Sequence, residues 1–492
     1  MFSNGKQYRR TLRHDFLASL SVFLVALPLC IGVAVASGVP AEFGIVTGIV
    51  GGLIAGALPG SHLQVSGPAA GLTVLVYETV TIYGLRALGV VVLAAGLLQL
   101  LMGALRLGRW FRAISASVVH GMLAGIGLVL IVGQAYALAD RAPPGSALAN
   151  LAGLPQLLVQ TAGAQEALVA ACVGLATIAL LAVWRFAPGP LRSVPAPLAA
   201  IALTAGAAAL LRLPVGRVRV EGLLGSLQPL GLGDLTRLAE PALAGTVLAF
   251  ALIASAESLF SAAAVDRMHD GPRTHYDREL IAQGVGNSVC GMLGALPMTA
   301  VIVRSAANVR AGARTRASRI LHGLWLLLFV ALAPAALGLI PLAALAGLLV
   351  HAGWKLIGIR SWSRLWRTDR GEALVLVVTA LTIVATNLLE GVLVGLLLAV
   401  AKTAWTLSHV DVALDDRGDA VRVRLSGNAT FLRLPGLLDT LEELPPGKPA
   451  ELDLSGLRHL DHATSSALEA WTTQRNNQGT DVRLTDATAG RD

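Results

Sequence analysis

The sequence predicts a polytopic α-helical membrane protein with a small α/β domain at its carboxyl end. Of its 492 residues, 55% are hydrophobic and only 14% are charged, whereas soluble globular domains carry roughly a quarter charged residues. Apolar runs of the length that crosses a bilayer, about 20 residues, recur from residue 16 to residue 407. These repeated runs exclude a single membrane anchor. After Lys402 the pattern changes to the period-two alternation that is typical of strands.

The apolar runs, cut at their Pro, Gly and charged breaks, predict about fourteen membrane helices. Their expected ranges are 15–37, 41–58, 66–83, 87–105, 114–138, 165–185, 195–212, 242–265, 278–295, 298–310, 318–337, 339–357, 371–387 and 389–408. Residues 1–14 form a basic leader before the first helix. The first run is too long for a signal peptide and leads straight into another span, so we interpret it as a membrane helix.

Lys and Arg are unequally distributed between alternate connections. If the amino terminus is cytoplasmic, the leader and the inner connections carry 21 Lys and Arg residues, and the outer connections carry six. Four of these six belong to one long loop, 213–241, or lie at its edge. This asymmetry predicts that both termini face the cytoplasm of a bacterial inner membrane. Because the net charge of +8 is scattered between apolar runs and forms no single basic face, no nucleic-acid partner is expected.

An even number of spans divides into two halves of seven, at about 15–212 and 242–408. Because seven is odd, the halves are predicted to be inverted relative to each other, and matching interrupted helices in such halves indicate a transporter's binding site. The third element of each half opens with a Pro-containing segment, and the segments contain Ser66, Gly67, Pro68 and Ala69 in one half and Pro297, Met298, Thr299 and Ala300 in the other. Pro suits a first helical turn, where its missing N–H would be unpaired anyway. Two helix amino termini that face each other make an anion site, although two ordinary kinked membrane helices would give the same pattern.

Glu257 stands alone in an otherwise apolar span, and an intramembrane carboxylate is a functional hypothesis by default. It could bind a proton, or it could coordinate Na⁺ together with Ser261, which lies one helical turn later on the same face. A carboxyl group that only forms hydrogen bonds between helices is the alternative. With no base or nucleophile beside it, Glu257 does not indicate an enzyme.

Three further polar residues fall within the predicted spans. Arg304 lies one to two turns inside the second interrupted helix, where it could hold an anion, pair with Glu257, or extend to the inner interface. Gln283 and Asn287 are four residues apart and so share a helix face, where they could contact a ligand or join helices.

No nucleotide-binding loop, nucleophile elbow or zinc-protease motif is present, and the three Cys residues lack metal-ligand spacing, so no cofactor or metal is expected.

These residues together resemble the SulP family (sulfate permeases, solute carrier 26). The resemblance rests on residues 257–259, 279–284, Asn287, Pro297, 304–309 and 312–315, and it extends to residues 27–29, 36–38 and 66–68 near the amino terminus. It implies a seven-plus-seven inverted repeat split into a core and a gate domain, with substrate bound between the facing half-helices of elements three and ten. It also implies a cytoplasmic STAS domain and a homodimer.

The resemblance also bears on coupling and substrate. Glu257 falls where sodium-dependent bicarbonate members have an Asp that helps to bind Na⁺ and where many other members have Glu, which favours proton symport, with Ser261 as a residual cation ligand. Sulfate-type members have a Gln and an aromatic residue after the first Pro, where this chain has Leu29 and Cys30. We therefore expect a small carboxylate, either bicarbonate or a dicarboxylate such as fumarate. Sodium-coupled bicarbonate or sulfate symport, anion exchange and a channel-like or sensor role are the alternatives.

Residues 409–492 resemble a short STAS domain. Alternation predicts strands at 421–425, 428–431 and 451–457, a helix that begins with an Asp or Thr cap near Asp461, and a last strand at 481–484. The Asp-Ser pair that is phosphorylated in anti-sigma relatives is Asp461-His462 here. A phosphorylation switch is therefore not expected, although Thr464 or Ser465 could substitute.

Overall fold

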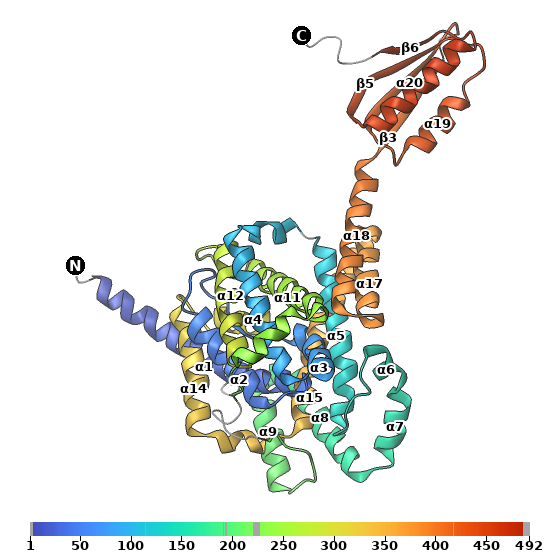
Figure 1. Cartoon of the computed structure of the whole chain (residues 1–492). Helices are drawn as coiled ribbons and strands as arrows, with labels where there is room; N and C mark the ends of the chain where they lie inside the picture. The colour runs from blue at the N-terminus through green and yellow to red at the C-terminus, as the bar shows by residue number, and fades with distance from the viewer. Residues whose placement is uncertain are drawn as a thin grey trace. The chain divides into compact units, whose positions relative to one another are not determined.

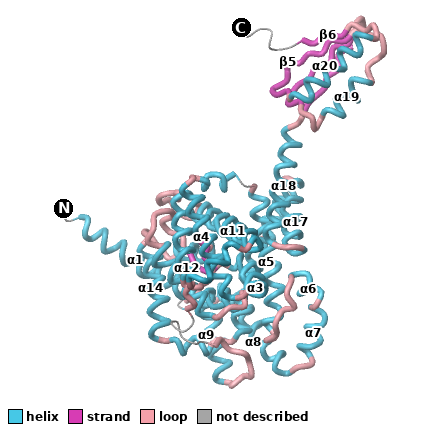
Figure 2. The backbone as a smooth tube through the Cα atoms, in the orientation of Figure 1, coloured by secondary structure: helices cyan, strands magenta, loops and turns pink. Residues whose placement is uncertain are grey.

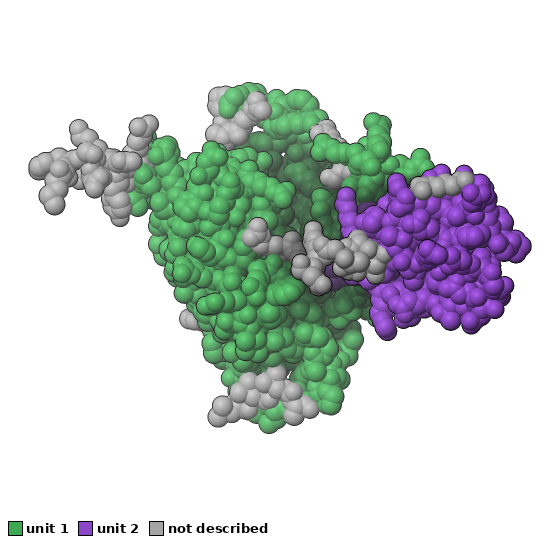
Figure 3. Space-filling model, turned by 90° about the horizontal axis from the view of Figure 1, so that it is seen from above, with its two compact units in different colours: residues 1–395 green, residues 396–492 purple. Residues whose placement is uncertain are grey.

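The computed structural model describes residues 3–113, 115–189, 191, 194–219, 227–416 and 418–485. The chain forms two compact units, Met1–Gly395 and Leu396–Asp492, which are drawn as ribbons in Figure 1 and coloured separately in Figure 3. Parts of the predicted leader 1–14, of the predicted outer loop 213–241 and of the carboxyl end of the range 409–492 lie outside the described residues.

The first half of the helical unit follows the predicted spans to within a few residues, apart from an earlier start of its first helix. Its elements are α1 (Ser3–Ala36), α2 (Ala41–Val50) with a π-helical end (Gly51–Ala55), β1 (Ser66–Pro68), the 3-10 turn η2 (Ala70–Leu72), α3 (Thr73–Tyr83), α4 (Leu85–Ala104), η3 (Leu107–Ala113), α5 (Ala116–Leu138), α8 (Gln165–Val183), η4 (Trp184–Phe186) and α9 (Ala196–Leu210). Two short helices between α5 and α8, α6 (Ala147–Ala152) and α7 (Leu154–Ala162), were not predicted.

The second half also contains two helices followed by a short strand and a further helix. It contains η6 (Leu232–Ala239), α11 (Pro241–Val265), α12 (Tyr276–Met292), β2 (Met298–Ala300), α13 (Ile302–Arg310), α14 (Ala317–Leu332), η7 (Pro334–Leu339), α15 (Leu342–Ile357), α16 (Ile359–Thr368), α17 (Arg370–Ala385) and α18 (Leu388–Leu407). In the described part of the chain, seven helices are long and apolar enough to cross a membrane, and four more apolar helices are shorter. The protein is thus a multi-pass membrane protein, while the inverted relation of its halves stays a prediction.

The openings of the two interrupted elements are strands, and the prediction of helices that begin at residues 66 and 298 was wrong. β1 and β2 pair in antiparallel fashion, with Ser66 opposite Ala300 and Pro68 opposite Met298, and they are the short strands among the helices in Figure 2. Val301 N extends the pairing by donating to Val65 O at 3.0 Å. Pro favours an extended residue before it, and backbone groups in a membrane interior must be satisfied by protein. The Pro residues therefore precede the helical turns and do not occupy them.

Small residues bring the membrane helices into close contact. A Cβ atom added to Gly52 would lie 2.5 Å from Gly323 Cα of α14, and one added to Gly96 of α4 would lie 2.5 Å from the Ser288 nitrogen of α12. Small residues at helix interfaces permit such close packing in lipid. α4 packs along α12 and α1 along α14, whereas α5 packs against α15 and α17.

The unit at the carboxyl end contains a four-stranded sheet of order β3-β4-β5-β6 with β3 (Val410–Asp416), β4 (Val421–Ala429), β5 (Ala450–Leu460) and β6 (Val482–Thr485). β3 and β4 are antiparallel, and the other neighbours are parallel. Apolar side chains from β4 and β5 pack against α19 (Leu434–Glu442) and α20 (His462–Asn477). The strands predicted at 421–425 and 428–431 are one continuous strand that ends at Ala429, and β3 and α19 were not predicted.

Asp461 caps α20, as the sequence predicted. Its Oδ1 accepts a hydrogen bond from Thr464 N at 2.8 Å, and its Oδ2 accepts one from Phe431 N at 2.7 Å. Hydrogen bonding from Thr464 lowers the pKa of Asp461 below its ordinary value. Thr464 itself is completely buried, so it is not accessible to a kinase in this conformation.

We expect Asp461→Ala to lower the free energy of unfolding of a soluble fragment, residues 405–492, by about 1 kcal/mol, the usual cost of a lost N-cap. Because the folded-state pKa of Asp461 is lowered, its stabilisation is present above its ordinary pKa of about 4 and is lost as the pH falls through the lowered value. The difference in free energy of unfolding between the parent and the variant should therefore become smaller in acid. Urea unfolding at pH 7 and below pH 3 measures it.

Asp481→Ala is the matched control. Asp481 pairs with Arg483 at 2.9 Å, but both side chains are more than half exposed, and exposed ion pairs contribute little. Equal losses of stability in the two variants, or a difference between Asp461→Ala and the parent that does not change with pH, would contradict the capping role.

Candidate functional site

A cavity of about 90 Å³ lies where the starts of η2 and α13 meet helices α1, α5, α11 and α15. Five residues singled out from the sequence line it, namely Leu29, Pro68, Glu257, Ser261 and Arg304. The remaining wall is apolar and comes mainly from α5, α15 and the start of α13. The cavity thus combines one acidic and one basic side chain with an otherwise hydrophobic lining.

Arg304 is the third residue of α13, and its side chain is only 1% exposed. Its Nη2 lies 3.5 Å from Pro68 O, while Nε and Nη1 have no hydrogen-bond partner. Among the described residues it forms no ion pair, so it neither pairs with Glu257 nor extends to the interface. A buried charge is costly unless it is paired. Arg304 therefore supplies a positive charge that an anion in the cavity would neutralise.

Glu257 projects from α11 toward the start of the first half-helix. A Cβ atom added to Gly71 would lie 2.9 Å from both carboxylate oxygens, so the carboxyl group rests against the η2 backbone. Glu257 Oε2 is buried and forms no hydrogen bond of normal geometry, and the Thr299 hydroxyl lies close enough to interact with the carboxyl group. Ser261, one helical turn away, also lines the cavity and is 2% exposed. This side of the cavity can accept a proton or a small cation.

The other residues predicted from the two openings lie behind the cavity wall. Ser66, Gly67, Met298, Thr299 and Ala300 form the paired strands, and Ala69 and Pro297 flank them; all are buried and none lines the cavity. Cys30 is completely buried and faces α2, where a Cβ atom added to Gly48 would lie 2.8 Å from its Sγ. These residues shape the site without facing its interior.

Gln283 and Asn287 brace the strands from α12. Gln283 Nε2 donates to Ser66 Oγ of β1 at 2.8 Å. Asn287 Nδ2 donates to Met298 O at 3.0 Å, and Met298 N donates to Asn287 Oδ1 at 2.7 Å. Of the two roles left open for this pair, ligand contact and joining of helices, the hydrogen bonds favour the second. Gln99 of α4 accepts a further bond from Asn287 Nδ2 at 2.8 Å and was not anticipated.

The sequence carried no signal for one wall of the cavity, and His322 beside Arg304 was set aside for want of a partner at ligand or triad spacing. The apolar wall includes Leu349, Ala352 and Leu356 of α15, which lie on one helix face by their spacing, but apolar residues in a membrane span give no signal of a ligand. His322 of α14 is completely buried, and neither ring nitrogen has a hydrogen-bond partner. It lies close enough to Arg304 for their charges to interact.

The cavity shares part of its lining with a larger hollow. The larger hollow has a volume of about 970 Å³ and is lined by Arg109, His120 and Arg267 among others. The residues that line both the hollow and the cavity are Val119, Leu123, Phe260 and Ile302. A second hollow of about 450 Å³, beside Tyr77 and Asp140, shares no lining residue with the cavity. Arg109 and Arg267 of the larger hollow belong to connections that the sequence predicts to face the cytoplasm.

Comparisons with known proteins agree with this architecture. The model of the Sulfate permease family matches residues 12–379, and a model described as Mlab, STAS domain matches residues 412–490. The chain is 27% identical over 403 residues to a putative sulfate transporter, YvdB, of Bacillus subtilis, with 78% of this chain and 72% of that protein covered. It is 27% identical over 450 residues to the bicarbonate transporter BicA of Picosynechococcus, with coverages of 85% and 75%.

Solved structures show the same fold. The transmembrane domain of a cyanobacterium bicarbonate transporter, BicA, aligns with a TM-score of 0.66 at 24% identity and covers 80% of this chain and 98% of that one. The structure of SLC26A9 aligns with a TM-score of 0.75 at 14% identity, with coverages of 97% and 84%.

We expect Gly71→Ala to impair anion binding, because the added methyl group would press on the carboxyl group of Glu257. Overpacking typically costs about 1–3 kcal/mol, which corresponds to a roughly 5- to 150-fold loss of affinity if the strain falls on the bound state. Gly206→Ala in α9 is the control, since a Cβ atom there has no neighbour within 4 Å. Calorimetric titration with anions measures the effect, and equal affinities for the two variants would contradict the proximity of Gly71 to the site.

Proposed function

This chain belongs to the sulfate permease family of anion transporters, and from that premise we propose that it carries a small carboxylate across the membrane in symport with a proton. The chain is a transporter and not an enzyme. The observation that carries the proposal is one cavity lined by Arg304, a buried cation without an ion pair among the described residues, and by Glu257, a carboxyl group with an unsatisfied oxygen.

The anion is expected to bind at Arg304. Its guanidinium has two nitrogens without partners, and the amino-terminal ends of η2 and α13 add partial positive charge from their free N–H groups. The apolar remainder of the wall and the cavity volume of about 90 Å³ suit a small anion with few polar atoms. Bicarbonate fits this description, as does one carboxyl end of a dicarboxylate such as fumarate. Relatives of the chain are described as sulfate and bicarbonate transporters.

Charge balance links the anion to the proton. In the empty cavity, the charges of Arg304 and ionised Glu257 sum to zero. An anion that binds alone leaves one excess negative charge in an apolar environment, which is costly. A proton on Glu257 restores neutrality. The cavity can therefore be sealed from water at least cost when the anion and the proton are both bound or both absent. Na⁺ held by Glu257 and Ser261 would restore neutrality in the same way and is the second candidate.

The remaining features of the proposal follow from the sequence. We place the protein in a bacterial inner membrane, since its relatives include bacterial proteins, and we place both termini in the cytoplasm because of the asymmetry in basic residues. The transporter domain would comprise residues 15–408 as two inverted halves, 15–212 and 242–408, which form a core and a gate. Residues 409–492 would form the STAS domain, and the protein would act as a homodimer. Facing half-helices joined by β1 and β2 support the two-half arrangement.

We expect proteoliposomes to accumulate labelled bicarbonate or fumarate more strongly when an inward proton gradient is imposed. Glu257→Gln should lose this proton-driven gain in accumulation, because glutamine cannot exchange a proton. A coupling free energy of about 1–3 kcal/mol corresponds to a roughly 5- to 150-fold smaller gain in accumulation. Labelled sulfate and an inward sodium gradient serve as the comparison substrate and gradient.

Glu78→Gln is the matched control, since Glu78 is a half-buried carboxyl group of α3 that does not line the cavity. Uptake that follows a sodium gradient would favour the second candidate. Uptake that ignores both gradients and the Glu257 substitution would contradict symport and leave exchange or a channel-like role.

We further expect Arg304→Gln to abolish stabilisation of the protein by the transported anion. A ligand that binds only the native state stabilises it by about 2.7 kcal/mol at 100 times its Kd. The parent should therefore unfold at a higher temperature as the anion concentration rises, and Arg304→Gln should show no such rise. Because the substitution also removes a buried unpaired charge, the anion-free variant should unfold at a temperature no lower than that of the parent. An anion-dependent shift that survives in Arg304→Gln would place the anion elsewhere.

A further inference from the structure

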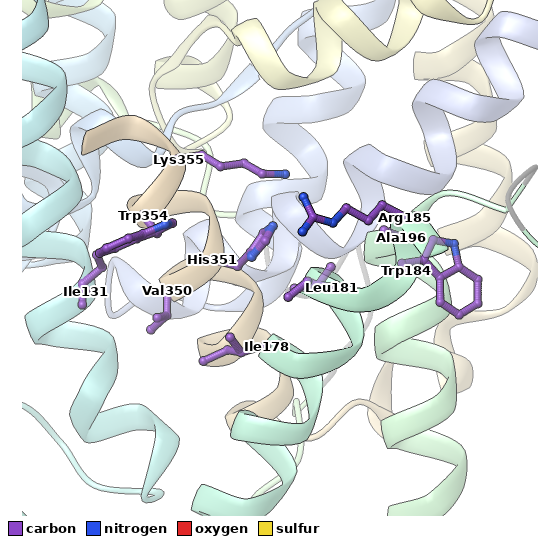
Figure 4. A pocket seen from close by; sticks show the side chains of 11 residues that line it. Ile131, Ile178, Leu181, Trp184, Arg185, Ala196, Val350, His351, Trp354 and Lys355 are labelled. Atoms are coloured by element: carbon purple, nitrogen blue, oxygen red, sulfur yellow. The ribbon is translucent and has the colours of Figure 1, made fainter. Parts of the chain in front are cut away.

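A second pocket, of about 760 Å³, lies on the opposite face of α15 from the substrate cavity. Leu349, Ala352 and Leu356 face the cavity, whereas His351, Trp354 and Lys355 line this pocket together with residues of α5, α8 and α9. Figure 4 shows its lining side chains. One helix therefore separates two distinct hollows.

Three nitrogen-bearing side chains converge in this pocket. The ends of Lys355 and His351, from α15, point toward the guanidinium of Arg185, from η4 (Figure 4). The lining contains no acidic residue, and among the described residues neither Arg185 nor Lys355 forms an ion pair. Arg185 instead lies over the Phe186 ring, with its Cζ 4.6 Å from the ring centroid. Cationic groups that gather without a counter-charge indicate an anionic ligand.

The rest of the lining is hydrophobic and aromatic. Ile131, Ile178, Leu181 and Val350 form its apolar part. Trp184 donates its indole N–H to Val194 O at 2.9 Å, and Trp354 is 58% exposed. A charged end next to an apolar, open surface suits an amphipathic ligand better than a free inorganic anion.

The pocket also lies at the expected depth in the membrane. Arg185 and Lys355 belong to connections that the basic-residue asymmetry assigns to the cytoplasmic side. Trp side chains concentrate at the membrane interface, and basic pockets between membrane helices on the cytoplasmic side bind the head groups of anionic lipids.

We propose that this pocket binds one anionic phospholipid of the inner leaflet. The phosphate lies among Arg185, Lys355 and His351, and an acyl chain follows the apolar side chains of α5 and α8. Because the site is on the far side of α15 from Arg304 and Glu257, the proposal does not depend on which anion is transported or on its coupling.

Native mass spectrometry of the full-length protein, with added phosphatidylglycerol or phosphatidylcholine of identical acyl chains, tests the proposal. We expect the parent to retain one phosphatidylglycerol with higher affinity than phosphatidylcholine. Glycerol phosphate, which has the head group without the chains, should not displace it. Displacement by glycerol phosphate would mean a free-anion site, and equal retention of the two lipids would overturn the proposal.

Arg185→Gln/Lys355→Gln should bind phosphatidylglycerol about 30-fold more weakly, given the usual contribution of each basic residue near an anionic lipid. Its binding of phosphatidylcholine should not change. Arg364→Gln is the matched control, because Arg364 is an exposed residue of α16 that does not line the pocket. An equal loss of phosphatidylglycerol binding in Arg364→Gln would indicate general surface charge, and unchanged binding in the double variant would refute the site.

A fluorescence measurement decides the question even if the double variant fails to fold. The difference between parent and Trp354→Phe spectra in nanodiscs isolates the emission of Trp354. Phosphatidylglycerol brominated on its acyl chains should quench this difference more than brominated phosphatidylcholine at the same mole fraction. Equal quenching by both lipids would count against a bound anionic lipid.

Discussion

Hydrogen bonding between β1 and β2 allows two helices to begin inside the membrane unit, and the rest of the site depends on it. Backbone N–H and C=O groups cannot be left unpaired in lipid. The strands 66–68 and 298–300 pair with each other, and side chains satisfy further groups, since Met298 N donates to Asn287 Oδ1 and Ala300 N donates to Ser258 Oγ. Gln283 and Asn287 of α12 then fasten the two strands to the surrounding helices. The ends of η2 and α13 are held at one cavity by this arrangement.

The same arrangement places the two ionisable groups. Arg304 follows β2 by one helical turn and reaches back to β1, with its Nη2 3.5 Å from Pro68 O. Glu257 reaches the start of the opposite half-helix at Gly71, where an added Cβ atom would lie 2.9 Å from both carboxylate oxygens. Each half of the chain thus contributes a helix start, while both charged side chains come from the second half. The separation of Arg304 from Glu257 leaves both free to interact with a transported species.

The sequence was informative wherever hydrophobicity alone decides structure. Helices such as α5 and α11 were predicted to within two residues, because long apolar runs between charged connections have few alternative readings in lipid. β1 and β2 could not be predicted, since three residues show no period-two alternation and their pairing joins positions over 200 residues apart. Arg304 was identified as a candidate, but its burial depends on contacts with β1. The α15 wall was missed because apolar residues in a span carry no local signal. His322 was set aside because it has no partner at metal-ligand or catalytic-triad spacing in the sequence.

The antiparallel register also restricts how this site can change during evolution. Ser66 faces Ala300, Gly67 faces Thr299 and Pro68 faces Met298, and all six side chains or backbone positions are buried. A larger residue at one position therefore needs a smaller one opposite, and a shift of either strand by one residue would turn both helix starts away from the cavity. The lining contributed by α1, α5 and α15 consists of ordinary side chains and can change one residue at a time. The strand pair, in contrast, can be altered only by paired replacements on both halves of the chain, so two segments more than 200 residues apart in the sequence must change together.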